Sequence, residues 1–149
     1  MRRAFAALLL LSACSGAPDL PQVTIPLRNP TAPVASQADA TAARLAGEWV
    51  VVQGAGVAPG TRLRFSERAM SLDGVAMPMA TRGAGRFELA GQTVWVHWLD
   101  ADNRTAAMGD PAGARVWIMD RGGAPGERLH AAREILDWYG YDLRRLDGV

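Results

Sequence analysis

The sequence predicts an all-β fold: one short, eight-stranded, antiparallel up-and-down barrel with a single C-terminal α-helix packed outside it. Three observations predict this fold. Between residues 45 and 121, short apolar runs alternate with turns rich in Gly, Pro and Asp, which is typical of many short strands. The runs at 93–99 and 115–119 are apolar on both faces, so another element must cover part of the outer surface. An apolar stripe at helical spacing then follows between Glu127 and Tyr139.

Residues 1–13 have the pattern of a secretory signal peptide. Arg2 and Arg3 form its basic region, and the apolar region at 4–11 is too short to cross a bilayer of about 30 Å as a helix. The segment leads into Leu11-Ser12-Ala13-Cys14, which resembles a bacterial lipobox. Cys14 is the single cysteine of the chain and has no disulfide partner, so we expect it to become the acylated first residue. Stable anchoring requires at least two acyl chains, which a lipoprotein cysteine of this kind carries.

The expected location is the bacterial cell envelope, with the protein held by its lipid at the membrane surface. Ser15 follows the expected lipidation site, and a residue other than Asp at that position favours the outer membrane, with the domain facing the periplasm.

Residues 14–43 read as a lipidated tether. The stretch is rich in Pro, Ala, Thr and Ser, and frequent proline favours extended, solvated backbone over helix or sheet. Its last part, from Asp39 to Arg44, could form a short helical turn. Residues 44–149 are then the barrel domain with its helix.

Eight strands are expected within that domain. Tight hairpins are expected at Asp73-Gly74 and Ala90-Gly91. Closing so many short strands into a barrel removes unpaired sheet edges. The predicted strands are Trp49–Gln53, Thr61–Ser66, Ala69–Leu72, Val75–Met79 (the weakest, because it contains Pro78), Arg86–Leu89, Thr93–Leu99, Arg104–Met108 and Arg115–Met119.

The helix expected over Glu127–Tyr139 is the natural cover for the strands that are apolar on both faces. Its apolar side chains form one stripe, and Gly140 suits the position just after a helix end. We therefore expect the helix to pack against the outside of the last strands.

Two motifs resemble those of the lipocalin family, in particular the lipoprotein lipocalins of bacterial outer membranes. One is Gly47-Glu48-Trp49, which opens an apolar strand. The other is an apolar strand ending in Arg121, followed by a helix that stops at Gly140-Tyr141-Asp142. The resemblance implies a barrel that binds an apolar molecule without performing chemistry on it. It also implies a structural motif in which Trp49 closes one end of the barrel and the Arg121 guanidinium lies against its indole. The stretch 28–43 resembles the lead-in of related lipoprotein lipocalins, which implies that part of it packs on the barrel.

The expected ligand is small and hydrophobic, of the fatty acid or lysophospholipid type. Met70 and Met77 are candidate lining residues, because small side chains and adaptable methionines leave room in a barrel. On the penultimate strand, alternation allows either face to point inward. We favour Trp95, His97 and Leu99 as the ligand-binding face, with Trp98 beneath the helix. The alternative is that the aromatic side chains of Trp95, Trp98, Trp117 and Phe87 simply fill the interior.

Other classes of function find little support. With Cys14 expected to be lipidated, no Cys/His nucleophile remains, and we expect no enzyme, no cofactor and no metal site. The Asp100-x-Asp102 segment lacks the glycine and glutamate of a calcium loop. A formal net charge of +1 supplies no basic field for nucleic acid.

A second function class stays open. A barrel lipoprotein with a filled lumen can act as a protein-binding module or inhibitor in the periplasm through its exposed loops. Related inhibitors usually rely on a disulfide, which this chain cannot form.

Overall fold

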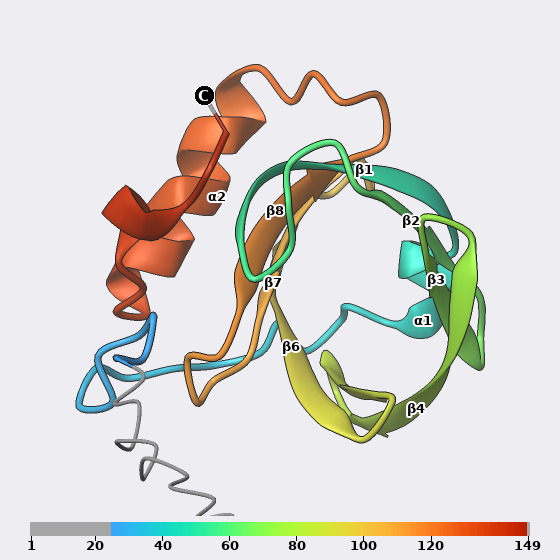
Figure 1. The fold of residues 1–149 in the computed structure, drawn as a ribbon, viewed down its shortest axis with the longest axis horizontal. Helices are drawn as coiled ribbons and strands as arrows, with labels where there is room; N and C mark the ends of the chain where they lie inside the picture. Colours follow the sequence, from blue (N-terminus) through green and yellow to red (C-terminus); the bar gives the residue numbers. More distant parts are fainter. Residues whose placement is uncertain (1–24, 149) are drawn as a thin grey trace, which may run out of the picture.

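The computed structural model describes residues 25–148, and the expected signal peptide and Cys14 lie outside this range. Figure 1 shows a barrel with one long helix beside it. Within the described residues, no helix is both long and apolar enough to cross a membrane. The elements are α1 (Ala42–Leu45), β1 (Gly47–Ala55), β2 (Arg62–Phe65), β3 (Ala69–Leu72), β4 (Val75–Gly83), β5 (Arg86–Leu89), β6 (Gln92–Leu99), β7 (Thr105–Gly109), β8 (Val116–Asp120), α2 (Glu127–Trp138) and a 3-10 turn, η1 (Leu143–Arg145).

The predicted eight-stranded antiparallel barrel is confirmed. Each strand pairs with its sequence neighbours, and β1 pairs with β8 to close the sheet. β3 and β5 have the predicted bounds, whereas β4 continues past Met79 to Gly83. Pro78 is tolerated inside β4 although it lacks an amide hydrogen, and its carbonyl still accepts the Ala90 N–H at 3.0 Å.

Side chains fill most of the barrel interior. The inward residues of the strands form one buried cluster together with Leu45 of α1 and Ala40, which close one end. Trp49, Trp117 and Phe87 are among the largest fully buried side chains. Of the four aromatic residues named in the alternative of a filled interior, Phe87 and Trp117 lie inside the barrel, whereas Trp95 and Trp98 do not.

A second apolar cluster lies on the outside of the barrel. Ala107, Val116 and Ile118 point away from the lumen and pack with Ala132 and Leu136 of α2. This packing explains why the last strand is apolar on both faces. The helix ends as predicted, with Gly140 at φ +85°, where a Cβ atom would also lie only 2.5 Å from the Cβ of Ala32.

The N-terminal arm, residues 25–41, packs on the barrel, as the resemblance of residues 28–43 implied for part of this stretch. The solvated tether stays a prediction for residues 14–24, which lie outside the described range. The arm passes the C-terminal end of α2 and then runs along the barrel to α1 (Figure 1). Its Gln37 N–H donates to the Val96 carbonyl at 2.8 Å, and the Gln37 side chain accepts from the Leu99 N–H at 2.7 Å. Arg28 is buried, and its Nε donates to the Tyr139 carbonyl at the end of α2 at 2.7 Å. Proline-rich sequence favours extended backbone, and here that extended backbone finds hydrogen-bond partners on the fold.

Candidate functional site

The two ends of the barrel differ. The closed end carries α1 and the strand connections 66–68, 84–85 and 100–104, whereas the open end carries the connections 56–61, 73–74, 90–91 and 110–115. Because the strands run up and down, alternate connections lie at the same end. Any ligand entering along the barrel axis meets the open end first.

Gly47, Trp49 and Arg121 come together at the closed end. The Arg121 guanidinium carbon lies 4.0 Å from the Trp49 ring centroid, which is the contact that the resemblance implied. Nη1 and Nη2 of Arg121 donate to the carbonyls of Ala46 and Arg44 at 2.9 and 3.0 Å, and its Nε donates to the Asn103 carbonyl at 2.6 Å. We call this arrangement the floor lock.

Glycine is required at position 47 for two reasons. Its φ of +104° is unfavourable for residues with a side chain, and a Cβ atom there would lie 2.9 Å from Arg121 Nη1. The Trp49 Nε1 donates to the Leu45 carbonyl at 2.7 Å, which fixes the indole under the arginine. The Gly-x-Trp motif is thus explained by the close approach of Arg121 to the backbone.

At the open end, a cavity of about 230 Å³ remains above the filled interior. We call it the cup. Met70 and Met77, both predicted as lining residues, lie in its wall. Two polar side chains, Gln92 and Arg115, also line the cup, and the 2%-exposed Trp117 forms part of it. Its other lining residues are apolar or small: Val57, Leu63, Leu72, Leu89, Ala90 and Val94.

The prediction that Trp95 and His97 face the lumen is wrong, although Leu99 does face it. Val94, Val96 and Leu99 of β6 belong to the interior cluster. The pairing of β6 with β7 shifts register between Val96 and Trp98, and this bulge breaks strict alternation. As a result His97 and Trp98 both point outward. Trp98 packs with the outer cluster beside α2, as predicted.

Trp95 and His97 instead belong to the outer surface of the barrel. The Arg86 guanidinium carbon lies 4.3 Å from the Trp95 ring centroid. His97 is only 3% exposed, beneath the arm and the segment after α2. Its Nδ1 is 2.8 Å from the Ala35 carbonyl, and its Nε2 is 2.8 Å from the Tyr141 hydroxyl. This arrangement gives His97 a structural position rather than a place in the cup.

Burial is the main influence on the pKa values of His97 and Tyr141. It lowers the pKa of His97 to about 4; the hydrogen bond with Ala35 acts in the opposite direction, and the nearby Arg28 charge lowers the pKa further. Burial also raises the pKa of Tyr141. In the neutral His97 ring, Nδ1 carries the proton and donates it to the Ala35 carbonyl. Nε2 is then unprotonated and is a hydrogen-bond acceptor facing the Tyr141 hydroxyl. Tyr141 also donates to the Asp110 carbonyl at 2.8 Å, so its one hydroxyl hydrogen faces two acceptors.

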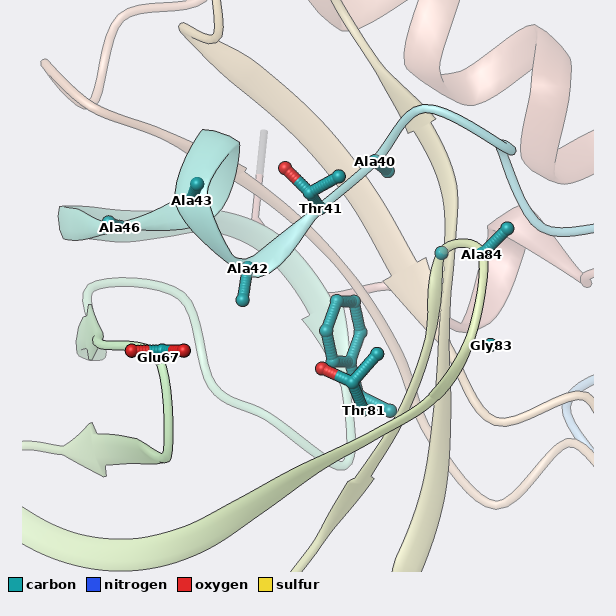
Figure 2. Close-up of a pocket in the computed structure, with 11 residues that line it drawn as sticks. Ala40, Thr41, Ala42, Ala43, Ala46, Glu67, Thr81, Gly83 and Ala84 are labelled. Atoms are coloured by element: carbon teal, nitrogen blue, oxygen red, sulfur yellow. The ribbon is translucent and has the colours of Figure 1, made fainter.

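A second hollow, of about 540 Å³, lies at the closed end between α1 and the β4–β5 hairpin, and we call it the floor pocket. Figure 2 shows Ala42 and Thr41 on one side, with Thr81 and Ala84 from the hairpin on the other. Its lining is mostly small, with Glu67 as the charged member. No motif in the sequence indicated this hollow, because it depends on where α1 meets the hairpin.

Among residues 25–148 there is no group of three or more His, Cys, Asp or Glu side chains able to hold a metal ion. The Asp100 carboxylate instead accepts the backbone N–H groups of Arg104 and Thr105 at 2.6 and 2.7 Å. It therefore organises the β6–β7 turn.

Sequence reasoning missed Trp117 and Arg115 as cup residues. The cup is built where four connections meet, and only the closed sheet brings β2, β3, β4, β5, β6 and β8 around one space. No family model matches the chain, and no curated protein matches it.

Proposed function

We propose that this protein is a membrane-anchored, lipocalin-like carrier or binder of a small hydrophobic ligand in the bacterial cell envelope, with Cys14 as its lipid anchor. The observation that carries the proposal is the apolar cup at the open end, with Arg115 and Gln92 among its lining. Apolar walls with a few polar groups are typical of small-molecule sites.

The size of the cup narrows the ligand class. Its volume of about 230 Å³ is below the roughly 300–1,000 Å³ of common ligand pockets. It equals the space of roughly eight water molecules at about 30 Å³ each. The cup therefore suits a small apolar ligand, or the end of one acyl chain, and Arg115 suits an anionic group such as a carboxylate.

Trp117 makes binding measurable by its own fluorescence. Titration with decanoate should change tryptophan emission saturably, and Trp117→Phe should remove most of that change, because Trp117 lines the cup. Trp95→Phe should leave it intact, because Trp95 lies on the outer surface beside Arg86. A loss of signal in Trp95→Phe alone would contradict binding in the cup.

Filling each hollow separately locates the ligand. Met77→Trp should fill the cup and weaken decanoate binding at least tenfold, whereas Thr81→Trp fills the floor pocket and should leave binding unchanged. The reverse pattern would move the site to the floor pocket. No saturable response in the wild-type protein would refute the ligand proposal.

A specific observation favours the second candidate, a protein-binding module or inhibitor. Most of the lumen is filled by buried side chains, which is the arrangement expected of a barrel that acts through its outer surface and loops. Absence of decanoate binding, together with retention of one periplasmic protein by the immobilised wild-type chain, would favour this function.

The anchor has its own test. Cys14→Ser should shift the protein from the membrane fraction to the soluble periplasm or stall its processing, because serine cannot form the thioether that carries a diacylglycerol. Metabolic labelling with a palmitate analogue should mark the wild type only. Equal labelling of Cys14→Ser would contradict the proposal of a lipobox.

A further inference from the structure

We propose that the open end of the barrel faces the phospholipid surface, so that the cup opens toward the bilayer. This inference rests on the proposed lipid anchor at Cys14, and it concerns the orientation of the domain, which the anchor alone does not determine.

The chain meets the barrel at its open end. The Leu27 N–H donates to the carbonyl of Gly113, in the β7–β8 connection, at 2.8 Å. The two segments are in close contact, since a Cβ atom on Gly113 would lie 2.9 Å from the Arg28 nitrogen. The arm is therefore held from this contact onward, and the described part of the chain begins, at Ile25, beside the open end.

The reach of that chain is short. Cys14 lies eleven residues before Ile25, and a fully extended chain of that length spans at most about 40 Å. The contact at Gly113 places the open end at the shortest distance from the anchor. The longest strands have nine residues and span about 30 Å, so the closed end can approach the membrane only if most of the chain's reach is used to run back along the barrel.

The two ends also differ in charge. Among the open-end connections 56–61, 73–74, 90–91 and 110–115, the charged residues are Asp73, Asp110 and Arg115. The longest uncharged connection, 56–61, reads Gly-Val-Ala-Pro-Gly-Thr. The shorter closed-end connections carry more charges: Glu67, Arg68, Asp100, Asp102 and Arg104. Asp100 is buried, but the other four are exposed, and approach of the closed end to lipid would dehydrate them, which is unfavourable.

Exposed apolar side chains lie at the same end as the chain exit. Ile25 is 70% exposed beside the β7–β8 connection, and Val75 is 69% exposed at the β3–β4 turn. The third large exposed apolar residue among those described, Trp138, lies on α2, next to the acidic Asp137. Ile25 in the arm and Val75 on β4 thus place two exposed apolar side chains at the end where the chain meets the barrel.

A matched pair of labelled variants tests the orientation. Ala58 at the open end and Ala84 at the closed end are both exposed residues in connections. Full-length acylated protein carrying Ala58→Cys or Ala84→Cys has one free thiol, which takes a nitrobenzoxadiazole fluorophore. Each protein is bound to vesicles of phosphatidylethanolamine and phosphatidylglycerol that contain a spin-labelled phospholipid, and flotation verifies that it is anchored.

We expect the label at Ala58→Cys to be quenched at least threefold more than the label at Ala84→Cys. Adding Val75→Asp should reduce that quenching without lowering the melting temperature, because Val75 is exposed. Equal quenching, stronger quenching at Ala84→Cys, or none in either floating protein would overturn the orientation while leaving the anchor intact. Protein that does not float would refute the anchor and the orientation together, whatever decanoate binding shows.

Discussion

Replacing Arg121 by lysine is expected to lower the free energy of unfolding by about 2–4 kcal/mol, since hydrogen bonds to charged groups contribute about 1.5–3 kcal/mol each and a cation–π contact about 0.5–2 kcal/mol. Arg121 stacks on Trp49 and donates to three backbone carbonyls at the closed end. Lysine keeps the charge but lacks the planar fork that serves the three acceptors. Urea denaturation measures the change.

Arg86→Lys is the matched control for the floor lock. Arg86 also lies over an indole, that of Trp95, at 4.3 Å, but it is exposed and its Nε donates to the Ser36 hydroxyl. Arg86→Lys should lower the free energy of unfolding by less than about 1 kcal/mol, as expected for an exposed cation–π contact. Equal losses for Arg86→Lys and Arg121→Lys, or no change in Arg121→Lys and Trp49→Phe, would contradict the floor lock.

Acidification should weaken the fold through His97. The pKa of His97 is lowered to about 4 in the folded protein from 6.5, so the unfolded chain binds more protons than the folded protein between these values. The contribution is fully present above pH 6.5 and is lost as the pH falls toward 4. Each pH unit in this window should remove up to about 1.4 kcal/mol, for a loss of about 3 kcal/mol.

Carboxylates also titrate in this range, so the measurement is a difference between variants. His97→Asn keeps a side-chain N–H for the Ala35 carbonyl but cannot titrate, so its stability should fall less steeply between pH 6.5 and 4 than that of the wild type. His130→Gln is the control, because His130 is exposed on α2 and should leave the slope unchanged. Identical slopes for wild type and His97→Asn would show that His97 is not held neutral by the fold.

Strand number and position were predictable because the determining features are local. Asp73-Gly74 and Ala90-Gly91 place Asp73 and Ala90 at positive φ in two-residue turns, and β3 and β5 end at the predicted residues. The apolar stripe of α2 and the two apolar faces of β8 likewise predicted, from the sequence, that the helix packs on the outside of this strand. At the closed end, the residues Gly47, Trp49 and Arg121 could be picked out in the sequence. The contact between Arg121 and Trp49, however, was predicted from a resemblance to a family and not from the spacing of these residues.

The direction of the β6 side chains could not be predicted from alternation. A bulge adds one residue on β6 opposite β7, and nothing in Val96-His97-Trp98 marks it. Its consequence is large, because it allows Val96 and Leu99 to face the lumen while His97 and Trp98 both face outward. The choice depends on what the outer face meets, and His97 meets Ala35 and Tyr141, each at least 44 residues away in sequence.

By itself the sequence determined an all-β barrel with an outer helix, because turn chemistry and apolar periodicity act over a few residues. Tertiary structure alone decided that Gln92, Arg115 and Trp117 line the cup beside the predicted Met70 and Met77, and which contacts hold the proline-rich arm on the barrel. No local sequence pattern marks Arg28, Gln37 and Ala40 of that arm as contact residues. In the structure, Arg28 bonds to Tyr139, Gln37 bonds to Leu99, and Ala40 packs at the closed end of the barrel. Such contacts join segments far apart in the chain, so their free energy depends on the assembled sheet and has no local signature.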